Sequence, residues 1–237
     1  MKLNRKRLAI GFLIACVGLF AVWEISKSRG FQAFGEIVPR VNTSQKVVAL
    51  TFDDGPTIEA TDRILAKLKE LNVRATFFLT GAELERNPSE GRKIALAGHE
   101  IGNHSYSHQR MSFVTPSFIE REIEDTDRQI RATGYAGAIH FRPPYGRKLF
   151  VLPYYLSKTN RKTITWDIEP DSYPKVAESS DKIARHVAEN VQPGSIILLH
   201  IMYKSRQTSL EAVSKIVGDL QSDGYRFVTI SELIEMK

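Results

Sequence analysis

The feature that most constrains the fold is a repeated alternation of short apolar runs with amphipathic helical patterns. Between most of the runs lie segments such as residues 61–72, whose leucines and isoleucine recur at helical spacing. Such alternation predicts an α/β fold with a parallel sheet, either an open doubly wound sheet or a closed barrel. Seven runs have the apolar and β-branched content of strands: 47–52, 74–79, 100–103, 139–142, 163–167, 195–200 and 226–230.

Residue types that can take part in catalysis or metal binding follow these predicted strands at the point where each strand ends. Asp53 and Asp54 follow the first strand, and His200 closes the sixth. In a β/α barrel the carboxyl ends of all strands meet at one rim, where the catalytic groups of such folds lie. The placement therefore predicts one shared site. The other residues that follow predicted strands in this way are His104 and His108, the Arg-Pro-Pro-Tyr-Gly stretch at 142–146, and the stretch 166–172.

The adjacent carboxylates Asp53 and Asp54 predict a bound cation, because two like charges side by side are unfavourable unless positive charge lies nearby. His104 and His108 are four residues apart, so on a helical turn they share a face and can bind one metal. Two imidazoles and one carboxylate suit Zn²⁺ or a similar divalent ion, and the second carboxylate can act as a base on water. Taken singly, each motif also has a structural interpretation, as a solvated acidic turn or an incidental histidine pair. The acidic stretch 120–128 is expected to be a solvated helix face.

Four motifs in this order carry a resemblance to a known family. They are Thr-Phe-Asp-Asp-Gly-Pro at 51–56, His-Ser-Tyr-Ser-His at 104–108, Arg-Pro-Pro-Tyr-Gly at 142–146 and Ile-Ile-Leu-Leu-His at 196–200. Together they resemble the motif set of the polysaccharide deacetylases, carbohydrate esterase family 4, over roughly residues 46–237. The resemblance implies a distorted (β/α)₇ barrel that removes acetyl groups with a divalent metal, for which Zn²⁺ is the expected ion.

The resemblance also implies a role for each matching residue. Asp53 would be the general base, and Arg142 would hold that base in place. Asp54, His104 and His108 would be the metal ligands. One of the two adjacent carboxylates would therefore bind the metal, and the other would accept a proton.

The remaining implied roles concern the substrate and the leaving group. The backbone N–H of Tyr145 would help to bind the oxyanion, which agrees with the absence of an N–H on Pro143 and Pro144. Leu198 would line the acetyl pocket. His200 would be the general acid that protonates the departing nitrogen.

One motif departs from the family pattern. Many members carry an Asp-Trp pair after the fifth strand, in which the acid tunes the histidine and the tryptophan walls the groove. Counting from Trp166, this chain has Ser172 and Tyr173 at those positions. Asp171, one residue earlier, is the candidate for tuning His200, with Asp167 as the second choice.

The first 30 residues predict a signal anchor. Four basic residues precede an apolar run over 8–23, which is short for a spanning helix of about 20 residues but can be extended by Ile25 and snorkelling flanks. The basic start favours a membrane-anchored protein whose bulk lies outside the cytoplasm. A cleaved signal peptide, giving a secreted protein, and a lipoprotein processed at Cys16 are the alternatives.

The distribution of charge argues against a nucleic-acid partner. Six of the 33 basic residues but one of the 27 acidic residues lie in 1–30, so residues 31–237 carry 27 basic and 26 acidic side chains. A nearly neutral domain lacks the basic surface that nucleic acids require. The expected organisation is an anchor over 1–30, a polar linker over 31–45 and a catalytic domain over 46–237.

The sequence therefore predicts a metal-dependent hydrolase that removes N-acetyl, or O-acetyl, groups from a cell-envelope or extracellular glycan such as peptidoglycan or an N-acetylglucosamine polymer. One alternative keeps the fold and takes a small amide or a lipid-linked sugar as substrate. Another is a non-catalytic glycan-binding protein, against which the presence of both Asp53 and His200 argues. An iron oxygenase with two histidines and one carboxylate is disfavoured by the extra acid beside the ligand.

Overall fold

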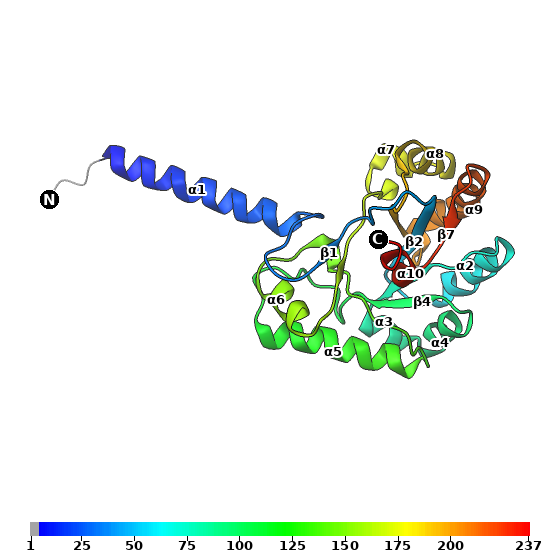
Figure 1. Ribbon diagram of the computed structural model, residues 1–237. Helices are drawn as coiled ribbons and strands as arrows, with labels where there is room; N and C mark the ends of the chain where they lie inside the picture. The colour runs from blue at the N-terminus through cyan, green and yellow to red at the C-terminus, as the bar shows by residue number, and fades with distance from the viewer. Residues whose placement is uncertain (1–4) are drawn as a thin grey trace.

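The computed structural model describes residues 5–237 and shows an α/β domain from which one long N-terminal helix, α1 (Arg5–Lys27), projects (Figure 1). Lys2 and the other residues of 1–4 in the predicted anchor lie outside the described residues. Ala9–Lys27 of α1 is long and apolar enough to cross a membrane, with a mean hydropathy of 2.1, and 6% of that window is buried. The rest of the chain surrounds a parallel sheet with helices.

The elements follow one another as an alternation of strands and helices. The strands are β1 (Ile37–Val38), β2 (Val47–Asp53), β3 (Thr76–Leu79), β4 (Glu100–Asn103), β5 (Thr163–Ile164), β6 (Ile196–His200) and β7 (Arg226–Phe227). The further α-helices are α2 (Ile58–Glu70), α3 (Gly81–Arg86), α4 (Pro88–Leu96), α5 (Pro116–Ala132), α6 (Val151–Lys158), α7 (Pro174–Ala177), α8 (Ser180–Asn190), α9 (Gln207–Ser222) and α10 (Ile230–Ile234). Three 3₁₀ turns are η1 (Pro144–Gly146), η2 (Pro170–Ser172) and η3 (Lys204–Arg206).

Parallel pairing confirms the α/β class predicted from the alternation. The main sheet has the order β4-β3-β2-β6, with β7 also paired to β2, and β1 pairs with β5. All of these pairs are parallel. The register places Asp53 opposite His200 of β6 and opposite Phe78 of β3. The carboxyl ends of these strands therefore lie at one edge.

The central strand β2 is buried on both faces, as expected for a parallel strand covered by helices. Val48, Leu50 and Phe52 belong to the large core cluster that includes residues of α2, α8 and α9. Val47 and Ala49 belong to a second cluster on the other face. Because side chains alternate along a strand, Asp53 projects to the same face as the second cluster.

The predicted strand over 139–142 is reduced to single bridges. Phe141 forms parallel bridges with Asn103 and with Thr163, and no named strand forms there. Pro143 and Pro144 follow at once and have no N–H to donate, so the pairing cannot continue. The predicted fifth strand is likewise short, and a separate bridge joins Ile168 to Ile197.

The segment predicted to be a polar linker, 31–45, packs onto the domain. Its strand β1 pairs with β5, and Val38 and Val41 are buried in the second core cluster. The Val41 N–H donates to the carbonyl of Gly194 at 3.0 Å. Gly194 has φ +82°, and a Cβ there would come within 1.8 Å of the Val41 carbonyl oxygen, so only glycine allows this approach. The stretch contains enough apolar side chains to join the core.

Candidate active site

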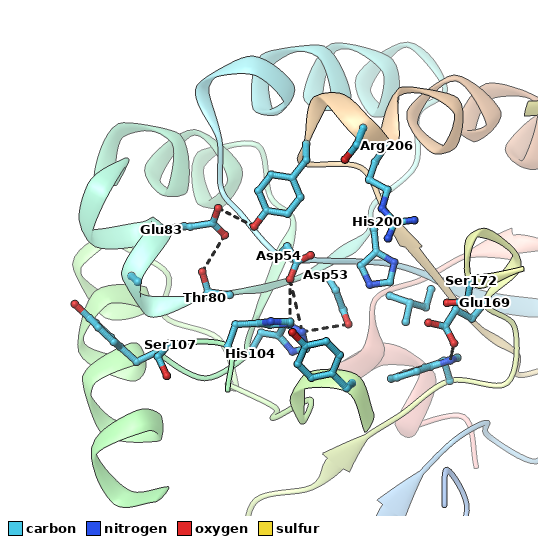
Figure 2. A pocket seen from close by; sticks show the side chains of 18 residues that line it. Asp53, Asp54, Thr80, Glu83, His104, Ser107, Glu169, Ser172, His200 and Arg206 are labelled. Carbon is cyan, nitrogen blue, oxygen red and sulfur yellow. Dashed lines mark hydrogen bonds and ion pairs between the residues drawn. The ribbon is translucent and has the colours of Figure 1, made fainter. Parts of the chain in front are cut away.

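A cavity of about 590 Å³ opens at the carboxyl edge of the sheet (Figure 2). Two of the predicted site residues, Arg142 and Asp171, do not line the cavity but contact residues that do. Arg142 contacts Asp53, and Asp171 contacts His200. The structure thus brings all of the predicted site residues to one place. Those that line the cavity are Asp53, Asp54, His104, His108, Tyr145, Leu198 and His200.

Asp54, His104 and His108 form a cluster with the geometry of a metal site. One ligand atom from each lies within 4.8 Å of the others. The Asp54 Oδ1 is 3.3 Å from the Nε2 of His108 and 3.9 Å from that of His104. Burial, together with the neighbouring His104, lowers the pKa of His108 to about 4, so this imidazole is neutral near pH 7. Neutral imidazoles and an ionised carboxylate are the forms that bind a divalent cation, so the donor set fits one.

The orientation of His104 is fixed by its second ring nitrogen. Its Nδ1 lies 2.8 Å from the carbonyl oxygen of Arg142, which directs Nε2 toward the cluster. A metal-binding histidine usually donates its other N–H to a carbonyl or carboxylate in this way. His104 is also buried, at 2% exposed, so little rotation of the ring is available.

The spacing of the two histidines predicted that they share one face of a helical turn, and this prediction is wrong. They lie in a loop in which Ser105 (φ 65°) and His108 (φ 56°) have left-handed backbone conformations. The Ser105 N–H donates to the Asn103 side chain at 2.8 Å, which favours a bend over a helix. The loop brings the imidazoles together, with ring centroids 4.9 Å apart.

Glu122 of α5 holds this loop and was not identified from the sequence. Its carboxylate accepts hydrogen bonds from the backbone N–H groups of Tyr106 (3.0 Å) and Ser107 (2.8 Å) and from the Ser107 hydroxyl (2.8 Å). The prediction that 120–128 is a solvated face is therefore wrong at this position. The signal was its spacing from Ile119 and Thr126, which places Glu122 on the buried face of the helix.

Asp53 is held by a buried arginine. The Arg142 Nη1 lies 2.6 Å from the Asp53 Oδ1 and 2.8 Å from the Thr51 hydroxyl, and Nη2 donates to the Thr165 carbonyl at 3.2 Å. Burial would raise the pKa of Asp53, but the charge of Arg142, with those of His104 and His200, holds that pKa below its ordinary value. The carboxylate is therefore ionised and able to accept a proton.

His200 stands opposite Asp53 in the register of β2 and β6 and is paired with Asp171. The His200 Nδ1 is 3.3 Å from the Asp171 Oδ1, and the His200 backbone N–H donates to Oδ2 at 2.7 Å. Burial alone would lower the pKa of His200, but the hydrogen bond and charge of Asp171, with the charges of Asp53 and Asp54, raise it to about 9. Asp167, the second choice, instead accepts from the Ser195 hydroxyl and the Ile196 N–H.

Tyr145 and Leu198 lie where a substrate acyl group would contact them. Tyr145 has φ 58° within η1, and none of the hydrogen bonds found in the described part of the chain uses its N–H. Tyr145 is 56% exposed, and the centre of its ring lies 4.8 Å from that of His108. Leu198 is fully buried in β6 and lines the cavity.

After the fifth strand, where the sequence differs from the family motif, Ser172 lines the cavity and Tyr173 does not. The Tyr173 ring packs 5.3 Å from that of His186. The aromatic lining on this side comes from Trp166, whose Nε1 donates to Glu169 at 2.8 Å. Tyr203 lines the cavity as well.

Glu83 of α3 is a second residue that the sequence did not reveal. Its carboxylate accepts from the Gly55 N–H at 2.6 Å, from the Thr80 hydroxyl at 3.0 Å and from the Tyr203 hydroxyl at 2.9 Å. Thr80 and Glu83 have the spacing of a helix capping box, which suggests only a local role. Glu83, which is seen beside Thr80 in Figure 2, joins the loop after β2 to the loop after β6 through these hydrogen bonds.

Comparisons with known proteins agree with this geometry. The sequence model of the polysaccharide deacetylase family matches residues 40–164. A peptidoglycan-N-acetylglucosamine deacetylase of Bacillus cereus is 40% identical over 190 residues, which cover 79% of this chain and 68% of the relative. A crystal structure of a peptidoglycan N-acetylglucosamine deacetylase in complex with 4-naphthalen-1-yl-N-oxidanyl-benzamide has a TM-score of 0.77 and 37% identity, covering 83% of this chain and 91% of that chain.

A further similar structure belongs to a protein described as a pseudoenzyme of carbohydrate esterase family 4, from Bacillus anthracis. It has a TM-score of 0.77 and 29% identity, covering 86% of this chain and 70% of that chain. Similarity of fold therefore does not by itself separate an enzyme from a pseudoenzyme, and the side chains of the site must decide.

Proposed function

Because the chain belongs to the polysaccharide deacetylase family, we propose that it is a metal-dependent hydrolase that removes N-acetyl groups from a cell-envelope glycan. The observation that carries the proposal is the Asp54–His104–His108 cluster, with Asp53 and His200 beside it in one cavity. The names of the relatives point to peptidoglycan as the glycan. O-acetyl groups are a second candidate, because they present the same acetyl group on an oxygen instead of a nitrogen.

The fold proposed for this chemistry is a distorted (β/α)₇ barrel. The sheet order β4-β3-β2-β6 supplies one part of the wall. The bridges from Phe141 to Asn103 and Thr163, and from Ile168 to Ile197, support closure on the remaining side. Weak pairing at these points agrees with a distorted barrel.

The metal ligands in this proposal are Asp54, His104 and His108, and Zn²⁺ is the ion that their chemistry favours. A divalent ion bound there supplies positive charge that makes water a stronger nucleophile and polarises a carbonyl group. Asp53 would be the proton acceptor for a water molecule in the cavity. Arg142 keeps Asp53 ionised and fixes one of its oxygens, so that the other, 3.5 Å from the His104 Nε2, faces the cluster.

The other half of the proposed reaction needs an oxyanion donor and an acid. The Tyr145 N–H is the backbone donor for the oxyanion, since Pro143 and Pro144 have none. Leu198 forms the apolar contact for the acetyl methyl group. His200, kept protonated by Asp171, donates its proton to the departing amine.

The alternative of a non-catalytic glycan-binding protein requires none of these proton-transfer groups. Binding alone does not require a proton acceptor, Asp53, and a proton donor, His200, that line the same cavity. The similarity to a pseudoenzyme is a likeness of fold, whereas this chain carries the complete predicted set of metal, base and acid residues. A small amide or a lipid-linked sugar remains the alternative substrate.

The proposed organisation is a catalytic domain behind a membrane anchor. The apolar helix α1 is exposed along most of its length, and Phe12 and Leu19 are each more than 70% exposed. Insertion into a membrane would remove this apolar surface from water. Residues 46–237 would form the catalytic domain, with 31–45 packed against it and the domain outside the cytoplasm.

The test is acetate release by the full chain in detergent, with peptidoglycan, chitooligosaccharides, poly-N-acetylglucosamine and acetylxylan presented in parallel. We expect acetate and new free amines from at least one N-acetylated glycan, with loss of activity after chelation and recovery on addition of Zn²⁺. Acetate from acetylxylan alone would assign the enzyme to O-acetyl groups. Binding of a glycan without any acetate release would favour the non-catalytic alternative.

A further inference from the structure

A second cavity, of about 630 Å³, lies beside the first and is lined on one side by the C-terminal end of α1 and the residues that follow it. Glu24, Lys27, Ser28 and Arg29 form that side. Three residues, Tyr145, Trp166 and Glu169, line both cavities, so the two adjoin. We refer to residues 23–29 as the juxtamembrane segment.

Buried polar contacts fix the juxtamembrane segment to the domain. The Lys148 backbone N–H donates to the Ser26 carbonyl at 2.9 Å, and its side-chain amine donates to the Ser28 carbonyl. Ser26 and Lys148 are each 1% exposed. Removing the segment would take away this acceptor and part of what encloses the Lys148 side chain. The segment and Lys148 therefore shield each other from solvent.

Arg147 makes a second attachment to the juxtamembrane segment. Its Nη1 donates to the Ser26 hydroxyl at 3.0 Å, and its guanidinium lies 4.0 Å from the centre of the Trp23 ring. Arg147 follows the turn that contains Tyr145. The segment is thus joined directly to the loop that carries the proposed oxyanion donor.

Arg29 connects the juxtamembrane segment to the wall between the two cavities. It pairs with Glu169 at 2.5 Å, and the same Glu169 oxygen accepts from the Trp166 Nε1 at 2.8 Å. The Arg29 guanidinium also lies 4.8 Å from the centre of the Trp166 ring, and its carbonyl accepts from the Thr165 hydroxyl at 2.7 Å. Arg29 therefore sets the position of two residues that face the substrate cavity.

We propose that the juxtamembrane segment stays in the mature enzyme and forms a glycan subsite, in which the second cavity holds the sugar residues next to the one that is deacetylated. This inference rests on the proposed function, because it extends the same groove. The exposed ring of Tyr145 stands between the cavities and can pack against the face of a sugar. The charged groups of Arg29 and Glu169 can hydrogen-bond to sugar hydroxyls.

The charges of the second cavity favour a neutral sugar chain over a polyanion such as a lipid diphosphate. Lys27 pairs with Glu24 at 2.7 Å, and Arg29 pairs with Glu169. Two of the three cations that line the cavity are therefore already neutralised by carboxylates, which would repel a diphosphate. Since the segment includes the C-terminal end of α1, the bound strand would extend toward the end of that helix.

The first test compares kcat/KM on chitooligosaccharides of two to six sugars, using the full chain in detergent. In the wild type we expect kcat/KM to rise with length until both cavities are filled. Arg29→Ala should lower the hexamer-to-dimer ratio of kcat/KM about tenfold, the effect of losing a charged hydrogen-bond partner. Arg74→Ala, which removes another partly exposed arginine–glutamate pair far from the groove, should leave the ratio unchanged. An unchanged ratio in Arg29→Ala would overturn the subsite.

The second test measures binding without catalysis. Both tryptophans of the chain lie at this place: Trp166 lines the second cavity and Trp23 lies under Arg147, which also lines it. Titration with chitohexaose should therefore change the intrinsic fluorescence saturably. Glu169→Gln, which keeps an acceptor for the Trp166 N–H, should weaken this binding several-fold and serves if Arg29→Ala does not fold.

The two tests separate failure of the subsite from failure of the proposed function. If Glu169→Gln weakens the binding of chitohexaose but the wild type releases no acetate from any glycan, the proposed function fails and the subsite stands. If acetate is released but chitohexaose leaves the fluorescence unchanged, the subsite is wrong and the deacetylase stands.

Discussion

The Asp171 carboxylate contacts His200 through two different atoms, the ring Nδ1 at 3.3 Å and the backbone N–H at 2.7 Å. The Ser209 hydroxyl donates to the same carboxylate at 3.1 Å. These contacts fix both the position of the strand end and the orientation of the imidazole. They leave Nε2 as the nitrogen that can exchange a proton with a substrate in the cavity.

Asp171→Asn should move the basic limb of the pH–rate profile to lower pH. Because Asp171 is the main group that raises the pKa of His200 to about 9, its loss returns that pKa toward the ordinary value of about 6.5, and the acid form is lost at lower pH. The measurement is kcat/KM against pH, with metal content determined in the same samples. Asp167→Asn is the control, since Asp167 binds Ser195 and Ile196 and not His200.

His200→Ala should abolish this limb and lower activity by about 10²–10⁴-fold. Amide substrates should suffer most, because an amine leaving group needs a proton, whereas an activated aryl ester does not. A basic limb that persists in both variants would show that another group is the acid.

Asp54→Asn and Asp53→Asn should separate metal binding from proton transfer. Asp54→Asn removes a predicted ligand, so metal content and activity should fall together. Asp53→Asn should retain the metal and lose about 10²–10⁴-fold in rate, as expected for loss of a general base. The measurements are metal analysis after dialysis and acetate release. Equal loss of metal from both variants would assign both carboxylates to the metal.

Glu122→Gln should weaken the affinity for the metal, although Glu122 is not one of the predicted metal ligands. Glu122 accepts three hydrogen bonds from the loop that carries the two histidines, and an amide retains only one acceptor oxygen. Loss of such support typically costs about 10–100-fold in metal affinity or activity. The readout is the chelator concentration that halves activity. Glu124→Gln, on the exposed bond to Tyr155, is the matched control and should behave as the wild type.

The stability of the metal-free protein should fall as pH rises from about 6.5 to about 9. The folded-state pKa of His200 is raised above its unfolded value, so its contribution is fully present below the unfolded pKa and is lost as pH passes the folded pKa. The contribution is on the order of 3 kcal/mol from this group alone. Thermal midpoints in detergent across this range provide the measurement. Asp171→Asn should show a shallower dependence, and an equal slope in both proteins would contradict the prediction.

The sequence predicted the parts of the site that depend on strand ends. Asp53 and His200 close parallel strands, and parallel strands bring their carboxyl ends to one edge, so their proximity follows from the alternation pattern. The need for an acid beside His200 predicted that a carboxylate lies there, and the choice of Asp171 over Asp167 came from its place one residue before the family's usual acid position. The structure places Asp171 beside His200.

The parts that the sequence did not predict depend on loop geometry and on contacts far apart in the chain. The loop from His104 to His108 is bent by Asn103 and Glu122, which a four-residue spacing does not reveal. Arg29 and Glu169 are separated by 140 positions, and no local pattern links them. A stretch that pairs through single bridges, as at Phe141, has no sequence pattern that distinguishes it from a loop.

Four residues of the site adopt left-handed backbone conformations: Asp54, Ser105, His108 and Tyr145, with φ between 56° and 73°. Each costs about 1–2 kcal/mol for a side chain other than glycine. Folding and catalysis therefore compete at these positions. Tyr145→Gly should raise the thermal midpoint while lowering activity, and an unchanged or lower midpoint would contradict this expectation. A lineage that no longer needs the reaction gains stability by abandoning these residues, so loss of catalysis is an easy evolutionary step for this scaffold.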